Sequence, residues 1–203
     1  MSEAHPRTAV CGLMLLAVVA GAAAGCGSPA PGALRGAAQG YLPTIDQLPS
    51  PDFTVYQAVK EVGAGWLDPG SSTALDKDGL TRAAEVEFYR NVSFSTSNGP
   101  ITLTAAVADF TTTAGASTAM IRLDSALDSR AGAVPVSTGP LGAGGHATTT
   151  QGTAEGVGAL QVIVVWRVDN LVNSLVAEGR LGGLQLDQIL PLAAVQTANE
   201  RGG

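Results

Sequence analysis

Four residues have the types and the order that nucleophilic catalysis would need. Ser117 lies in Gly-Ala-Ser-Thr-Ala, after a predicted strand and at the start of a predicted helix. Asp124 and Asp128 follow on the same helix, and His146 is the one histidine after residue 25. A serine activated by a histidine, which a carboxylate orients, is the arrangement of a hydrolase. These residues support one interpretation of the sequence, in which the protein is a hydrolase that uses Ser117 and His146.

Three features of the sequence argue against that reading. The position two residues after Ser117 holds alanine, where a nucleophile turn ends in glycine. The strand before Ser117 belongs to a predicted hairpin rather than to a parallel sheet. Both aspartates share a short helix with Ser117, and we expect that helix to be unable to orient a distant histidine. The sequence therefore favours an ordinary helix start, a surface-loop position for His146, and no enzymatic activity.

The sequence also lacks the residue spacings that metal and phosphate sites require. Asp76 and Glu87 are placed as in a calcium-binding loop, but Thr81 takes the glycine position and Leu80 a ligand position. The glycine-rich stretch 139–146 leads into a predicted strand rather than a helix, so it predicts no phosphate cradle. We expect no cofactor and no metal ion.

Cys26 is the residue with the clearest predicted chemistry. An apolar run over residues 8–24 is too short for a comfortable membrane span, and small residues follow it, as in a secretory signal. The run ends in Ala-Ala-Gly-Cys, which resembles the lipobox of bacterial lipoproteins. That resemblance implies cleavage before Cys26, a lipid (palmitate among its acyl chains) on its sulfur, and attachment to the extracytoplasmic face of the cell membrane. Cys11, the other cysteine, would leave with the signal, so no unpaired thiol would remain.

Composition limits the classes of partner. Charged residues make up 14% of the chain, and the formal net charge is −6. An acidic chain whose lysines are Lys60 and Lys77 lacks the basic surface that nucleic-acid binding requires, so we expect no nucleic-acid partner.

The stretch from Val157 to Glu178 predicts a central hairpin. Two runs rich in β-branched residues flank Asp169-Asn170, and both of those residue types tolerate positive φ. A two-residue turn would place Trp166 opposite Asn173. One face of the hairpin is then the richer in apolar residues and carries Val162, Val164, Trp166, Val168, Leu171, Leu175 and Ala177.

The remaining patterns complete an α+β domain. Residues 86–94 and 101–109 alternate as a second hairpin, and residues 111–128 and the stretch around Ile189 predict helices. Because the helices do not alternate strictly with the strands, we predict an antiparallel sheet of five to seven strands. We expect two to three helices, packed mainly on one face. The predicted organisation is a signal peptide over 1–25, a flexible tether over 26–40 and one domain over 41–203.

Several short motifs resemble cell-envelope proteins. They are Asp109-Phe110, the alanine-rich helix 114–127, Pro140-Leu-Gly and Arg167-Val-Asp-Asn. The pattern is similar to small lipoproteins and extracellular sensor domains of high-GC Gram-positive bacteria. The resemblance implies an envelope-facing binding domain. We therefore expect a non-catalytic protein, held on the membrane through Cys26, that binds a small ligand or an envelope protein.

Overall fold

The computed structural model describes residues 36–63 and 72–202, without the side chains of 72–74. The predicted signal peptide, Cys26 and the first part of the predicted tether lie outside these residues. Among the helices that are described, none has the length and apolar character needed to cross a membrane.

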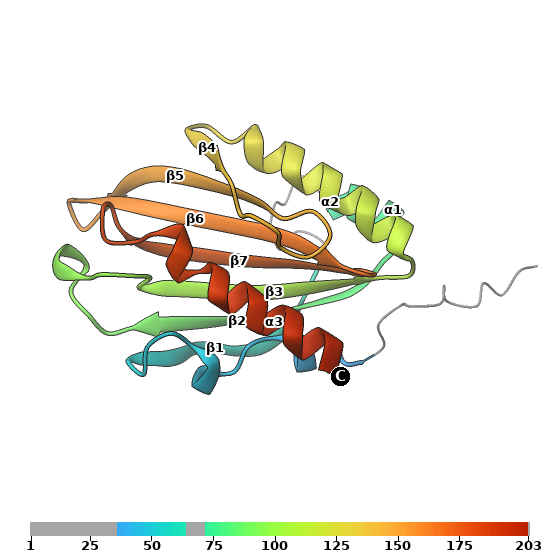
Figure 1. Cartoon of the computed structure of the whole chain (residues 1–203), viewed down its shortest axis with the longest axis horizontal. Coiled ribbons are helices and arrows are strands. Elements are labelled where there is room, and N and C mark those ends of the chain that lie inside the picture. The colour runs from blue at the N-terminus through green and yellow to red at the C-terminus, as the bar shows by residue number, and fades with distance from the viewer. Residues whose placement is uncertain (1–35, 64–71, 203) are drawn as a thin grey trace, which may run out of the picture.

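The domain is built on a seven-stranded antiparallel sheet (Figure 1). Its spatial order is β1-β2-β3-β7-β6-β5-β4. The strands are β1 (Phe53–Val62), β2 (Leu80–Arg90), β3 (Thr102–Phe110), β4 (Ala133–Val136), β5 (His146–Ala154), β6 (Val157–Val168) and β7 (Leu171–Arg180). The helices are α1 (Ser72–Lys77), α2 (Thr113–Asp128) and α3 (Leu190–Gly202), with 3-10 turns η1 (Ala38–Tyr41), η2 (Ile45–Gln47), η4 (Phe94–Thr96) and η5 (Leu186–Gln188). The α+β class and the strand number are confirmed.

The central hairpin has the predicted register. Val168 pairs with Leu171, and Trp166 pairs with Asn173, across the two-residue turn. Asp169 has φ of 49°, the left-handed conformation that lets so short a turn follow the twist of the strands. The predicted apolar face is buried along its whole length, and Trp166 is fully enclosed.

Helices cover both faces of this sheet, so the prediction that they pack mainly on one face is wrong. α3 lies across the front in Figure 1 and packs, with η1, over the face that contains Trp166. α2 packs over the opposite face, where Ile163, Val165 and Val172 are buried. These three residues share their face of the hairpin with Gln161, Arg167 and Ser174, so the sequence alone gives that face a mixed character. Because β6 and β7 lie in the middle of the sheet, their residues on both faces require cover.

The packed chain begins before residue 41. Ala38 and Tyr41 in η1 are 4% and 3% exposed and belong to the core under α3. Gly36 accepts a hydrogen bond at its carbonyl from Arg82. Residues 36–40, which the sequence analysis assigned to the tether, are thus part of the folded domain.

Replacing Trp166 with alanine is expected to destabilise the domain by roughly 3–5 kcal/mol, the usual cost of removing a large core aromatic. Its indole nitrogen also donates to the Thr197 hydroxyl on α3 at 2.9 Å. Thr197→Val should therefore cost less, roughly 1–3 kcal/mol, because it leaves the side-chain volume in place but strands the donor. Urea unfolding of both variants measures this; a Trp166→Ala protein as stable as wild type would contradict the assignment of the core.

Candidate functional site

The predicted catalytic residues are only partly brought together. His146 is the first residue of β5, and its Nε2 lies 2.9 Å from Oδ1 of Asp128 on α2. The expectation that His146 is a loop residue beyond the reach of this helix is therefore wrong. α2 packs across β5 and β6, so its carboxyl end comes beside the start of β5. Asp124, one turn earlier, is half-buried; burial raises the pKa of its carboxyl, and His146 opposes that rise.

Ser117 does not join this pair. It precedes Asp128 by eleven residues on the same helix, which is about 16 Å at 1.5 Å per residue. No triad can form over that distance, because each proton transfer requires hydrogen-bond contact. No group of three or more His, Cys, Asp or Glu side chains among the described residues could hold a metal ion. Asp78 instead accepts a hydrogen bond from Arg122 at 2.9 Å, which fixes α1 to α2.

The motifs on which the sequence resemblance rested meet at one end of the sheet. The Asn170 amide in the hairpin turn donates to Oδ1 of Asp109 at 2.8 Å and to the Phe110 carbonyl at 2.9 Å. Arg82 pairs with the other oxygen of Asp109 at 2.9 Å. Burial raises the pKa of the Asp109 carboxyl, and the Arg82 contact opposes the rise. These motifs therefore hold the turn of the central hairpin against β3.

The glycine of the Pro-Leu-Gly motif, Gly142, lies close to the backbone of β6. Gly142 has φ of 55°, and a Cβ there would lie 2.5 Å from the Arg167 carbonyl oxygen. The same carbonyl accepts a hydrogen bond from the Ala143 amide at 2.8 Å. This loop is thus fastened to β6, and its motif is structural.

A buried polar cluster lies beneath α3. Gln196 donates to Oδ1 of Asn173 at 2.8 Å and to the Ala106 carbonyl at 3.1 Å. Glu200, one turn further, is fully buried, and neither of its carboxyl oxygens has a hydrogen-bond partner in the described part of the chain. Burial raises the pKa of Glu200 to about 8, against the opposing influence of the Asn173 amide and the Arg201 charge. The cluster positions α3 on the sheet.

Beyond α2, the second face of the sheet becomes polar. Strand pairing puts Tyr89, Thr102, Glu178, Gln161 and Thr150 in one row across five strands, because each is the register partner of the next. The parallel row beside it carries Glu87, Thr104, Val176, Ile163 and Thr148. We call these two rows, together with the residues that line the hollows beside them, the polar face.

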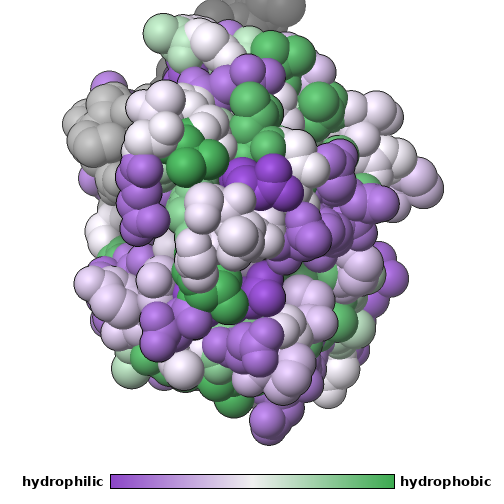
Figure 2. All heavy atoms as spheres, turned by 90° about the vertical axis from the view of Figure 1, so that its left-hand side faces the viewer, coloured by the Kyte–Doolittle hydropathy of each residue, from purple (hydrophilic) through white to green (hydrophobic). Residues whose placement is uncertain are grey.

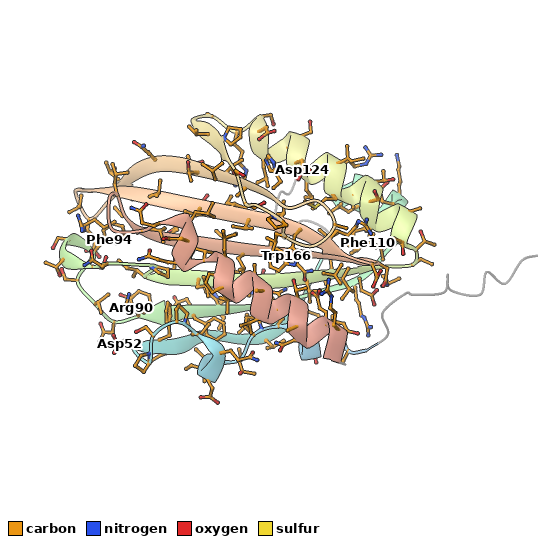
Figure 3. All side chains as sticks on the ribbon, viewed as in Figure 1. Asp52, Arg90, Phe94, Phe110, Asp124 and Trp166 are labelled. Carbon is orange, nitrogen blue, oxygen red and sulfur yellow. The ribbon has the colours of Figure 1, made fainter. Side chains whose placement is uncertain are left out.

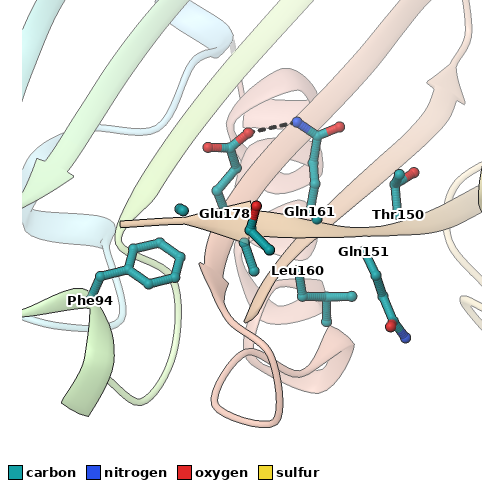
Figure 4. A pocket seen from close by; sticks show the side chains of 10 residues that line it. Phe94, Thr150, Gln151, Leu160, Gln161 and Glu178 are labelled. Atoms are coloured by element: carbon teal, nitrogen blue, oxygen red, sulfur yellow. Dashed lines mark hydrogen bonds between the residues drawn. The ribbon is translucent and has the colours of Figure 1, made fainter. Parts of the chain in front are cut away.

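Two hollows on the polar face adjoin at Gln161. The larger, of about 430 Å³, is lined by Gln57, Lys60, Glu85, Glu87, Thr104, Arg130, Gln161, Ile163 and Val176. The smaller, of about 230 Å³, is lined by Phe94, residues 150–154, Ala159, Leu160, Gln161 and Glu178 (Figure 4). Gln161 Nε2 donates to Oε1 of Glu178 at 2.7 Å, as the dashed line in Figure 4 marks. Sequence reasoning did not find this surface.

The polar face offers hydrogen bonds and a surplus of negative charge. Lys60 is already paired with Glu85 at 2.9 Å and donates to Gln57 at 2.6 Å. Glu87 and Glu178 have no ion pair with a described residue. Three carboxylates (Glu85, Glu87 and Glu178) and two cationic side chains (Lys60 and Arg130) line the two hollows, among amides and hydroxyls. Tyr89 and exposed Tyr56 stand in contact nearby, with ring centroids 6.4 Å apart. This chemistry suits a neutral or cationic polar ligand and disfavours an anion.

No protein-family model matches the chain, and no curated protein matches it. The chain is similar to the extracellular domain of PknH from Mycobacterium tuberculosis, with 13% sequence identity and a TM-score of 0.42. The match covers 74% of this chain and 82% of that domain. Lipidation of Cys26 and binding of a ligand stay predictions.

The buried carboxyl of Glu200 predicts how stability depends on pH. Its pKa is about 8 in the folded protein and near the ordinary 4.5 when unfolded. The native carboxyl stays protonated as the pH approaches 8, whereas the unfolded carboxyl ionises above about 4.5. The stability contribution is therefore complete below about pH 4.5 and is lost as pH rises through about 8. The loss should reach a few kcal/mol, at about 1.4 kcal/mol per pKa unit.

Urea unfolding at pH 5 and pH 8.5 measures this loss in wild type and in Glu200→Gln, which stays neutral throughout. Glu200→Gln should lose less stability between the two pH values. Glu61→Gln, at an exposed position of β1, is the matched control and should behave as wild type. The assignment fails if Glu200→Gln has the wild-type dependence on pH.

Proposed function

We propose that this protein is a lipid-anchored lipoprotein on the extracytoplasmic side of the cell membrane, and that its domain binds a polar ligand without catalysing a reaction. The observation that carries the binding role is the pair of adjoining hollows on the polar face. A sheet face of this kind is ordinarily covered by a helix or solvated as a flat surface. Here it is hollowed, half-buried and lined by side chains that can hydrogen-bond.

The hydrolase alternative, with Ser117 and His146, has the geometry against it. A separation of about 16 Å between Ser117 and the aspartate that pairs with His146 leaves the serine without a base. The imidazole and carboxylate form a hydrogen-bonded contact between α2 and β5. Binding without catalysis accounts for the residues better.

The anchor and the smaller hollow would lie at opposite ends of the domain. The tether enters through η1, which contacts α3 and lies near its carboxyl end, marked C in Figure 1. The smaller hollow lies by the β5–β6 turn, at the other end of β6, which is about 40 Å long at 3.3 Å per residue. A domain held through Cys26 would therefore present this hollow away from the membrane.

The first test concerns the anchor. Cys26→Ser should abolish lipid transfer and shift the protein from the detergent phase to the aqueous phase in a phase-separation assay. Each buried methylene contributes about 0.8 kcal/mol of membrane affinity, so two or three acyl chains hold a protein essentially permanently. Cys11→Ser is the matched control and should partition as wild type. Equal partitioning of Cys26→Ser and wild type would mean that the protein is exported but not anchored through Cys26.

The second test concerns the polar face. The full chain is purified from membranes in mild detergent, and molecules that remain bound are measured by mass spectrometry. A polar molecule should accompany wild type and fall at least about tenfold in the Gln161→Ala, Glu178→Ala double variant, because about 1.4 kcal/mol of lost hydrogen bonding is a factor of ten. Gln39→Ala, an exposed glutamine on η1, is the control. Equal retention by the double variant would exclude this face as the site.

A further inference from the structure

A third hollow, of about 330 Å³, lies on the other side of the β2–β3 connection from the polar face. Its wall is largely apolar, with Pro49, Pro100, Pro191 and the buried ring of Phe53. One charged side chain, that of Arg90 at the end of β2, lines it as well (Figure 3). Figure 2 faces the end of the molecule that carries these connections; apolar side chains form small separate groups there, among polar ones.

Arg90 is largely but not fully buried, and only one edge of its guanidinium is fully bonded. The side chain is 14% exposed and lies over Phe53, with Cζ 5.6 Å from the ring centroid. Nη1 donates to the carbonyls of Asn98 and Pro100 at 3.0 and 3.2 Å. On the opposite edge, Nε is buried and has no acceptor among the described residues. Nη2 reaches Oδ2 of Asp52 only at 3.5 Å.

Asp52 therefore balances this buried charge poorly. Its side chain is 61% exposed, and its nearest oxygen is well beyond the 2.7–2.9 Å of a strong charge-assisted hydrogen bond. Figure 3 places Asp52 and Arg90 next to each other at this end of the sheet. The Nε–Nη2 edge of a guanidinium matches the two oxygens of a carboxylate, so this edge is built for a bidentate contact that Asp52 does not supply.

Two neighbouring side chains add to the attraction for an anion. Gln188 accepts from the Gln185 amide through Oε1, so its Nε2 is the end that lies toward Gly99 in the wall of the hollow. Arg180 also contacts the β2–β3 connection, because its Nε donates a hydrogen bond to the Ser97 carbonyl at 3.2 Å. No described carboxylate lies within ion-pair distance of Arg180. Two guanidinium groups against one aspartate make this a locally positive place in a chain of net charge −6.

We propose that this hollow binds the terminal carboxylate of a short peptide whose last residue is apolar. The carboxylate would take the Nε–Nη2 edge of Arg90 and displace Asp52, and the last side chain would lie against the prolines and Phe53. A volume of about 330 Å³ is at the lower end of the range of small-molecule sites, which fits one or two residues. The site is independent of the polar face, whose chemistry disfavours anions.

The test is calorimetric titration of the full chain in detergent with N-acetyl-Ala-Ala, its carboxamide and acetate. The free acid should bind and the carboxamide should bind at least about tenfold more weakly, because the charged contact is lost. Asp52→Asn should bind the free acid several-fold more tightly than wild type, since the competing carboxylate is gone. Arg90→Lys should bind it at least about tenfold more weakly, because an ammonium cannot make the bidentate contact. Asp46→Asn, at an exposed acid on η2, is the control and should match wild type.

Equal binding of the acid and the carboxamide would overturn carboxylate recognition. Acetate binding as tightly as the dipeptide would overturn the peptide assignment and leave a site for small organic acids. Should Arg90→Lys fold poorly, Asp52→Asn decides: no gain in affinity contradicts the proposal. The polar-face variant Gln161→Ala, Glu178→Ala should bind the dipeptide as wild type does, so failure of one site is separable from failure of the other.

Discussion

The turn between β6 and β7 is the constraint on which the rest of the domain depends. Asp169 takes a left-handed conformation, and Asn170 ties the turn to Asp109 and Phe110 at the end of β3. Because side chains alternate from face to face with a period of two, this one fixed register decides every side chain on β3, β6 and β7. It puts Trp166 on the face covered by α3 and Ile163 on the face covered by α2. A slip of one residue would exchange the side chains of the two faces, and neither α2 nor α3 would then pack against its apolar partners.

The sequence predicts this hairpin because its signal is local. Two β-branched runs around Asp169-Asn170 are sufficient to give the turn, the register and the apolar face with Trp166. The cover on the second face is not predictable in the same way. Ile163 and Val165 share a mixed face with Gln161 and Arg167 of the same strand, and only their central place in the sheet shows that they must be buried. That place depends on β7 pairing with β3, which is a contact between distant parts of the chain.

The same non-local pairing explains why the candidate sites escaped prediction. The row that contains Thr102, Glu178 and Gln161 combines residues from strands far apart in sequence, and no short pattern encodes their adjacency. Asp128 and His146 meet because α2 crosses the start of β5, a matter of packing rather than of spacing. Arg90 does interrupt the apolar alternation of residues 86–94, and this interruption places a charge where the strand otherwise buries hydrocarbon.

The two edges of the sheet have a consequence for how copies of this domain can associate. β1 is interrupted by register shifts around Gln57, and β4 is four residues long with Pro135 inside it. Neither edge offers a regular ladder of free amide and carbonyl groups, which is what a neighbouring strand needs in order to add to a sheet. Exposed Val55 and Val59 would otherwise make β1 a natural template for such addition. Crowded copies of this domain can therefore collide edge to edge without joining into extended aggregates.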